Sequence, residues 1–450
     1  MSVQLTIDRA QLQDVALQCL HSARTLGASA ASCEVSESGG LSVTTRKAVV
    51  ETIENTRDKG VGITVYIGLR RGHSSTSDFS AVALAEAVHK AYDIARFTAE
   101  DEAAGLPDAD CLERSPRDLD LYHPWSIDTE GAIELARRTE RAAFGVDRRI
   151  VNSEGANVYV SCGHFILANT LGFVGGYSYS RHSISVAPIA RDRSGMQRDD
   201  WYSSSRRPDE LAAPEAIGAY AAQRALARLS ARKLSTRTCP VLLEAPVACS
   251  LLGSFVQAAS GGSLYRKASF LVDSIGKPVF PGHVSVREDP FVPAALGSSP
   301  FDEEGVRGQQ RDVVAGGVLN GYFLSTYSAR KLGMKTTGNA GGAHNLQLLS
   351  ANTRAEDDFE AMLRKLGRGL LVTEMIGQGV NIVTGDYSRG ASGFWVEGGR
   401  IRHPVEEITV AGNLREMFAG VAAIGADTVI SSTGWRIRPP STQNPLAPRE

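Results

Sequence analysis

The 450-residue chain has few cysteines and lacks the dense cysteine spacing that a disulfide framework needs. Its six cysteines are widely spaced and contain no CxxC pair: Cys19, Cys33, Cys111, Cys162, Cys239 and Cys249. This usage is typical of reduced thiols in a cytosolic protein, where most of them serve as small buried apolar side chains. We therefore expect a cytoplasmic chain.

Long apolar runs and an excess of one charge are also lacking. No stretch reaches the roughly 20 apolar residues that span a bilayer, and residues 1–10 are neither basic nor apolar in the manner of a secretory leader. The 48 Lys and Arg residues nearly balance 50 Asp and Glu residues, which gives a net charge of -2. Because binding to a polyanion needs a basic surface, we expect no nucleic-acid partner and no membrane partner.

Histidine pairs at metal-ligand spacing are missing. A zinc hydrolase usually takes two histidines from neighbouring turns of one helix, because only such residues converge on one ion. The nearest two of the nine histidines, His73 and His89, lie 16 positions apart. A long-range site remains an alternative to ordinary backbone hydrogen bonding, and it would draw on His164 and His182 with Glu154 or Asp199. The motifs GxSxG, GxxxxGK[ST] and GxGxxG do not occur.

Hydrophobic spacing divides the first half of the chain into helices and strands. A helical period predicts helices over 8–26, 129–146 and 209–229, and a further helix that begins at Asp78 or Ser80 and runs to Phe97. Runs of β-branched residues broken by glycine predict an antiparallel meander over 33–67 and further strands over 150–205. Residues 98–128, rich in Asp, Pro and Ala, form the predicted linker between them.

The second half of the chain is dominated by strand patterns and glycine-rich loops. Short helices are expected near 246–259, 353–366 and 413–422. The predicted fold is therefore α+β, with N-terminal and middle mixed parts built on antiparallel sheets and a C-terminal, mainly-β, barrel-like domain. The predicted domains are 1–110, 111–235 and 236–450, and the proline-rich tail beyond Arg438 is expected to fray.

Two glycine-rich segments supply candidate groove residues. In GGSLYRKASFL, Tyr265, Arg266 and Lys267 offer an amphipathic ring, a planar donor fork and a point charge. In VTGDYSRGASGFWVEGG the candidates are consecutive: Asp386, Tyr387, Ser388 and Arg389. The alternatives are a buried hairpin with solvated cations for the first segment and a tight turn with a paired Asp and Arg for the second.

A third segment, residues 324–345, reads LSTYSARKLGMKTTGNAGGAHN. Its glycines leave backbone donors free to line a groove, and the alternative is a mobile surface loop. Together GGSLYRKASFL, FDEEGV, STYSARKLG, TGNAGGAHN, GDYSRGASGFWVE and EITVAGNL resemble the TldD/PmbA family of metallopeptidases over roughly the whole chain. DKGVGITVYIG and residues 181–183 are similar to its PmbA branch, also called TldE.

The resemblance implies a cytosolic pair of subunits associated with peptide maturation and degradation. A TldD-type subunit carries a His-Glu-x-x-x-His zinc helix, and a PmbA-type subunit accompanies it. In this chain the matching positions are Gly253, Ser254 and Ala258, none of which has an imidazole or a carboxylate. The resemblance thus implies no catalytic residue, metal or cofactor in this chain and zinc in the partner. The family's late cysteine is missing, and the tail after Trp435 departs from the family's ending.

The leading hypothesis is a non-catalytic subunit that forms a pseudo-symmetric heterodimer with a zinc-bearing TldD-type paralogue. An unfolded peptide would enter by adding a strand to a sheet edge, because backbone pairing recognises extended chains with little sequence preference. Two alternatives remain: a stand-alone metallopeptidase with an unrecognised site, and a non-enzymatic modulator of gyrase or another regulator.

Overall fold

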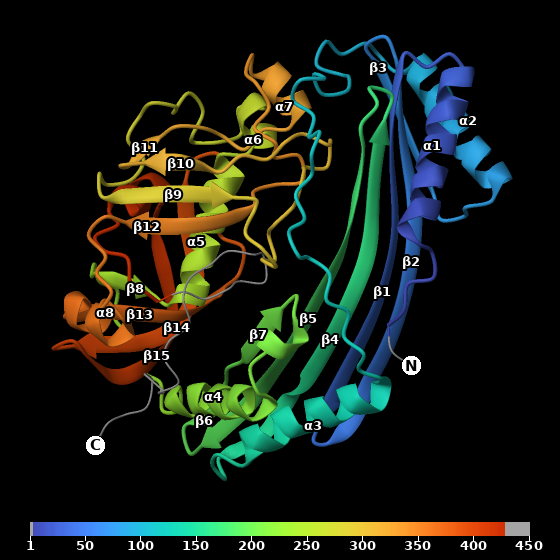
Figure 1. The fold of residues 1–450 in the computed structure, drawn as a ribbon. Coiled ribbons are helices and arrows are strands. Elements are labelled where there is room, and N and C mark those ends of the chain that lie inside the picture. The colour runs from blue at the N-terminus through green and yellow to red at the C-terminus, as the bar shows by residue number, and fades with distance from the viewer. Residues whose placement is uncertain (1–2, 428–450) are drawn as a thin grey trace.

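The computed structural model describes residues 3–427 and places a long, curved antiparallel sheet beside a second body formed by the C-terminal half (Figure 1). The sheet has the strand order β3-β2-β1-β4-β5-β6, and β7 pairs with β5. Its strands are β1 (Ala30–Arg46), β2 (Val49–Ile67), β3 (Arg70–Thr76), β4 (Ile150–Asn169), β5 (Val174–Asp192), β6 (Gly195–Arg198) and β7 (Trp201–Ser205). The predicted α+β class with antiparallel sheets is confirmed.

The centre of this sheet joins two parts of the chain that are far apart in sequence. β1 pairs with β4 from Ser32 opposite Asn169 to Thr45 opposite Ala156. Strands from the N-terminal part and from the middle part therefore share one hydrogen-bonded ladder. The predicted boundary near residue 110 falls in the connection between them, which is without regular helix or strand from residue 99 to 128 apart from an isolated bridge at Leu112.

Four helices cover one face of the sheet, two toward each end (Figure 1). They are α1 (Arg9–Thr25), α2 (Ala81–Phe97), α3 (Thr129–Phe144) and α4 (Pro214–Ala227). Inward residues of β1 such as Cys33 and Val35 pack with α1 and α2, whereas Leu41 and Val43 pack with α3 and α4. Odd-numbered β1 residues share a face because side chains alternate along a strand.

The predicted helices of this half are confirmed, with caps that explain their starts. Asp8 forms a capping box with Gln11 at α1, and the Ser80 hydroxyl accepts from the Ala83 N–H at α2. The predicted helix over 209–229 begins only at Pro214, because residues 208–210 form a separate 3-10 turn, η1 (Pro208–Glu210).

The C-terminal body consists of two four-stranded sheets with α5 (Ala245–Ala258) between them. One sheet has the order β11-β10-β9-β12 and the other β15-β14-β13-β8. The strands are β8 (Val241–Leu243), β9 (Val284–Asp289), β10 (Arg311–Ala315), β11 (Val318–Leu319), β12 (Asn345–Ser350), β13 (Arg368–Ile376), β14 (Asp386–Glu397) and β15 (Arg400–Asn413). The mainly-β character predicted for this part is confirmed.

Aromatic side chains fill the core around α5. Phe255 of α5 is fully buried and makes edge-on contacts with Phe280 and Phe418, with ring centroids 5.6 and 6.0 Å away. The remaining helices are short: α6 (Gly261–Tyr265), α7 (Thr326–Lys331), α8 (Phe359–Leu366) and α9 (Leu414–Ala419). The proline-rich tail lies outside the described residues.

A buried ion network ties the middle part to the C-terminal body. Arg224 of α4 is 3% exposed and donates to both carboxylate oxygens of Glu244, at 2.6 and 3.0 Å. Its Nε donates to Asp199 at 3.1 Å. Glu244 directly precedes α5, and its side chain is used for this pair instead of capping the helix. Arg228 adds a second link, to Glu374 of β13 at 2.7 Å.

None of the helices within residues 3–427 is both long and apolar enough to cross a lipid bilayer.

Removal of the Arg224 side chain is expected to destabilise the protein strongly. In Arg224→Ala, Glu244 and Asp199 would keep buried charges without their main partner, which costs about 3–5 kcal/mol. Urea unfolding would measure this loss. Arg138→Ala is the matched control, since its pair with Glu215 joins α3 and α4 at the surface and is expected to change little. Equal unfolding curves for the two variants would contradict the prediction.

Candidate functional site

Helix α5 carries the three positions at which the sequence resemblance places a zinc motif in other chains. Ala258 is fully buried, and its carbonyl accepts the Ser269 hydroxyl at 2.6 Å. The Ser254 hydroxyl donates to the Ser250 carbonyl in the preceding turn at 3.2 Å. Gly253 has no side chain. Since zinc needs imidazole, thiolate or carboxylate ligands, these three positions do not fit the ion.

The histidines of the large sheet do not converge on a metal site either. His164 of β4 lies opposite Ser178, whereas His182 of β5 lies opposite Val160. The two histidines are therefore offset by four positions, about 13 Å along the strands. Their suggested acidic partners have other contacts, because Glu154 accepts from Arg198 at 2.7 Å and Asp199 accepts from Arg224. The long-range site does not assemble.

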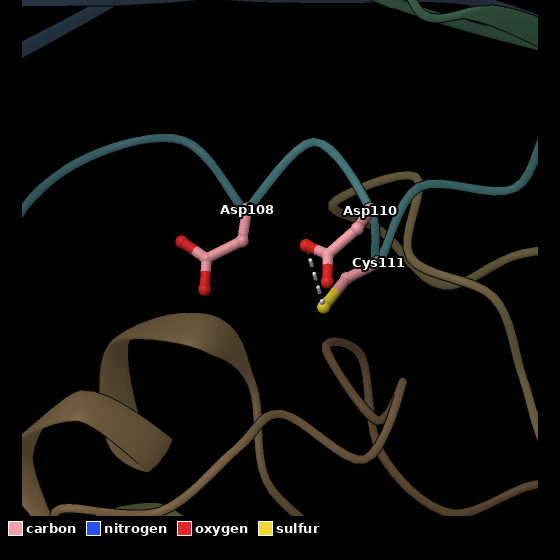
Figure 2. Close-up of side chains that lie close together, drawn as sticks. All are labelled: Asp108, Asp110 and Cys111. Atoms are coloured by element: carbon pink, nitrogen blue, oxygen red, sulfur yellow. Dashed lines mark hydrogen bonds between the residues drawn. The ribbon is translucent and has the colours of Figure 1, made fainter.

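Within residues 3–427 one group of possible metal ligands lies close together: Asp108, Asp110 and Cys111, with ligand atoms within 4.8 Å of one another (Figure 2). The Asp108 carboxylate already accepts from Arg330 at 2.9 Å. The Cys111 thiol points to Asp110, with Sγ 3.8 Å from its carboxylate oxygen. Burial and the neighbouring aspartates raise the pKa of this thiol, which disfavours the thiolate that a metal binds.

The first predicted groove segment forms α6 and the turn after it, not a hairpin. The Tyr265 ring meets the Tyr327 ring edge-on, with centroids 5.7 Å apart. The Arg266 guanidinium lies 5.2 Å from the centre of the Tyr265 ring and donates to its hydroxyl at 3.1 Å. Lys267 is exposed and has a left-handed backbone conformation, with a φ of 54°. These contacts form a small aromatic and cationic surface.

Tyr327 connects this surface to a cavity of about 650 Å³ between α7 and the linker after α2. Its hydroxyl donates to Asp101 at 2.8 Å, and Lys331 donates to the same carboxylate at 2.7 Å. The Lys331 hydrogen bond is the main reason that the pKa of Asp101 falls to about 2. Leu69 of the β2–β3 turn and Arg71 of β3 complete the wall. The cavity therefore lies where the first part of the chain meets the C-terminal body.

The second predicted groove segment lies on β14 and alternates between core and surface. Tyr387 is 3% exposed and belongs to the core around α5, whereas Asp386 and Ser388 are exposed. Asp386 accepts from the Thr384 hydroxyl at 2.6 Å. Arg389 instead donates to the Met375 carbonyl at 3.3 Å. Asp386 and Arg389 thus serve separate contacts, and the groove role of the exposed residues stays a prediction.

A buried polar network that the sequence reasoning missed holds the third glycine-rich segment. Glu288 of β9 is 1% exposed and accepts from Arg311 at 2.8 Å and from Asn339 at 2.7 Å. The backbone N–H of His344 donates to it at 2.9 Å, and the imidazole lies 3.2 Å away. Residues 336–344 are therefore tied to two strands, which argues against a mobile loop.

One signal in the sequence could have found this network. Val284 and Val286 face the core, so the alternation of β9 points Glu288 inward as well. An acid at an inward strand position needs buried partners. Burial opposes ionisation, but hydrogen bonds from His344 and the charge of Arg311 lower the pKa of Glu288 to about 2.

Asp302 in the FDEEGV segment links the loop of residues 301–306 to the loop of residues 336–344. It is 3% exposed and accepts N–H groups of Glu304 at 2.9 Å, Val306 at 2.8 Å and Ala340 at 3.0 Å. Burial, followed by the charge of Glu304, raises the pKa of Asp302 to about 7. The hydrogen bond from Ala340 to Asp302 therefore joins the FDEEGV loop to the TGNAGGAHN loop.

Substitution of Glu288 is expected to lower the free energy of unfolding of the protein. Glu288→Gln keeps the side-chain volume but removes the charge that pairs with Arg311, at a cost of roughly 3 kcal/mol. The free energy of unfolding in urea measures the effect. Asp312→Asn is the matched control, because its pair with Arg287 spans the same two strands at the surface. An unchanged Glu288→Gln protein would rule out a stabilising role for the network.

Asp302 is expected to make the protein less stable as pH rises. Its folded pKa near 7 exceeds the ordinary value near 4, so the folded state binds more protons between these pH values. This contribution to stability is full below about pH 4 and is lost as pH approaches 7. Asp302→Asn should therefore show a smaller loss of stability between pH 5 and 7.5 in urea unfolding. The same pH dependence in both proteins would refute the assignment.

Comparisons with known proteins agree with this architecture. The family model described as PmbA/TldA metallopeptidase domain 1 matches residues 31–95, the central-domain model matches 122–229, and the C-terminal-domain model matches 236–445. The metalloprotease PmbA of Escherichia coli O157:H7 is 46% identical over 393 residues, which is 87% of this chain and 86% of that protein.

Solved structures show the same fold over nearly the whole length. A proposed modulator of DNA gyrase from Bacteroides thetaiotaomicron has a TM-score of 0.89 and 26% sequence identity, and the match covers 96% of this chain and 97% of that chain. TldE from Thermococcus kodakarensis has a TM-score of 0.83 over 94% of this chain and 97% of that chain. Its identity is 17%, so that likeness concerns the fold alone.

Proposed function

Because this chain belongs to the PmbA/TldD family of metallopeptidases, we propose that it is the non-catalytic, PmbA-type subunit of a cytosolic heterodimer. Its TldD-type partner supplies the zinc and cleaves unfolded peptides, while this chain shapes the chamber that holds them. This chain then has no metal or cofactor of its own and binds neither nucleic acid nor membrane.

The observation that carries the proposal is the surroundings of α5. A buried methyl group, a hydroxyl bonded within its own helix and a glycine occupy the three positions of the zinc motif. None can bind a cation strongly or take a proton from water at neutral pH. The loops of the C-terminal part are nevertheless held in place, by the ion pair of Glu288 with Arg311 and by the backbone hydrogen bonds of Asp302. Ordered loops together with a helix that has no zinc-ligand side chains at these positions are what we expect of a subunit that helps to form a peptide chamber but binds no metal.

Peptide capture is proposed to use the edges of the C-terminal sheets. The two sheets end at β11 and β12, and at β15 and β8. The outer edge of β11 already pairs with residues 276–279 and that of β15 with Arg232, which leaves β12 and β8 for a peptide. An unfolded peptide can add to such an edge through backbone hydrogen bonds, which require no particular side chains. The proposed side-chain contacts are the surface around Tyr265, Arg266 and Lys267, the exposed Asp386 and Ser388, and the half-buried Arg389.

A second candidate is a metallopeptidase active without a partner. It is favoured by the name of the 46% identical relative, which is a metalloprotease. Such an enzyme would need a metal site that this chain forms outside α5. A third candidate, a modulator of gyrase, follows the description of the Bacteroides structure. The near-neutral net charge of -2 gives it no electrostatic support on DNA.

The proposal predicts that the purified chain is free of zinc and inactive on flexible peptides, whereas a mixture with a TldD-type partner cleaves them. Elemental analysis would measure the metal content, and mass spectrometry would follow the products. In the control, the partner carries a substitution of the Glu in its zinc motif, and the mixture should be inactive although the two chains still pair. Stoichiometric zinc and cleavage by the lone chain would establish the second candidate instead.

A further inference from the structure

A separate pocket lies on the helix-bearing face of the large sheet, in the gap between α1 and α3. Its volume is about 480 Å³, within the range of small-ligand sites. One wall is the extended N-terminal segment, residues 3–8, and the other is the end of the long linker, residues 122–126. The base includes His164 of β4. Neither the zinc motif positions nor the C-terminal loops take part in it.

The base of the pocket is built by a row of polar residues across three neighbouring strands. Glu37 of β1 lies opposite His164 of β4, which lies opposite Ser178 of β5. The Ser178 hydroxyl is 2.8 Å from Nδ1 of His164. Glu37 is 1% exposed, and its carboxylate accepts the N–H groups of Thr6 and Ile7, each at 2.9 Å. This buried carboxylate fixes the N-terminal wall to the sheet.

The linker places one aromatic side chain, Tyr122, against the base of the pocket, and a second, Trp125, against His182 farther along the strands. The Tyr122 ring lies 5.9 Å from the His164 ring and is 39% exposed. The Trp125 ring meets His182 edge-on at 5.5 Å. Both aromatic residues line the pocket. The face of an aromatic ring attracts cations because the π electrons give it a partial negative charge.

The charged side chain that lines the pocket is acidic, although Arg57 lies beside the N-terminal wall and donates to the Gln4 carbonyl at 3.5 Å. The lining residues include Asp8 but no Lys or Arg. One Asp8 oxygen accepts the Gln11 N–H at the start of α1, which offsets the partial positive charge of that helix end. Its other oxygen has no hydrogen-bond partner among residues 3–427. The nearby Arg9 is turned aside and donates to the Gly176 carbonyl at 2.7 Å. Burial lowers the pKa of His164 and favours the neutral imidazole.

We propose that this pocket binds the cationic side chain of a lysine or arginine from a polypeptide. The ammonium or guanidinium group would lie against the face of Tyr122, with the second oxygen of Asp8 as hydrogen-bond acceptor. Its aliphatic stem would contact the apolar side chains of the N-terminal wall, as long basic side chains commonly do. The site lies outside the groove and the missing zinc motif, so it does not depend on the proposed function.

Binding of a single side chain provides the test. The probe is N-acetyl-lysine-N-methylamide, and N-acetyl-norleucine-N-methylamide is the matched neutral probe, with the same stem but no ammonium group. Dissociation constants are measured by ligand-observed NMR on the full chain. We expect the lysine probe to bind more tightly than the neutral probe, and the difference to shrink at high salt.

Variants of Tyr122 separate a cation site from a general apolar surface. Tyr122→Leu keeps an apolar side chain without a π face and should weaken lysine binding about three- to fivefold. Tyr122→Phe keeps the π face and should bind nearly as the wild type does. Tyr159→Leu alters a similarly exposed tyrosine, 38% exposed, on the opposite face of the sheet and should leave binding unchanged. Equal binding of both probes, or an unchanged constant in Tyr122→Leu, would overturn the proposal.

Discussion

The contact between Arg224 and Glu244 is the constraint on which the arrangement of the two bodies depends. The guanidinium comes from the last turns of α4 on the large sheet, and the carboxylate comes from the residue that begins α5. Both groups are almost completely buried. A buried pair of this kind contributes little net stability relative to apolar packing, but it tolerates few geometries. The direction in which α5 enters the C-terminal body is therefore coupled to the position of α4.

Helices and hairpins of the first half could be predicted from the sequence because their signals are local. Asp8 and Ser80 mark helix starts, and the alternation of β1 is visible within a single strand. The pairing of β1 with β4 could not be predicted, because more than a hundred residues separate the two strands. The same alternation of side chains would occur if the N-terminal and middle parts each formed a separate antiparallel sheet, so the alternation cannot show that β1 and β4 join them into one.

In the candidate site, too, features within one segment could be predicted from the sequence, whereas contacts between distant segments could not. Gly253, Ser254 and Ala258 lie within one short segment, and the residues alone show that none of them has a zinc-ligand side chain. The network at Glu288 joins strands and loops that are separated by more than fifty residues. The inward direction of Glu288 could be predicted from the alternation of β9. Its partners could not, because they come from segments that only the tertiary fold brings together. Tyr387 shows the reverse error, since a conspicuous motif residue proved to be part of the core.

The central pairing of β1 with β4 has a consequence for the order in which the protein can be made. β1 ends at Arg46, and its partner begins at Ile150. While the ribosome synthesises the intervening hundred or so residues, the first hairpin exposes one unpaired edge and an incomplete apolar face. Open strand edges are sites of unwanted association. That edge of β1 therefore stays unpaired until the middle part is made, and a fragment truncated before β4 would leave it open.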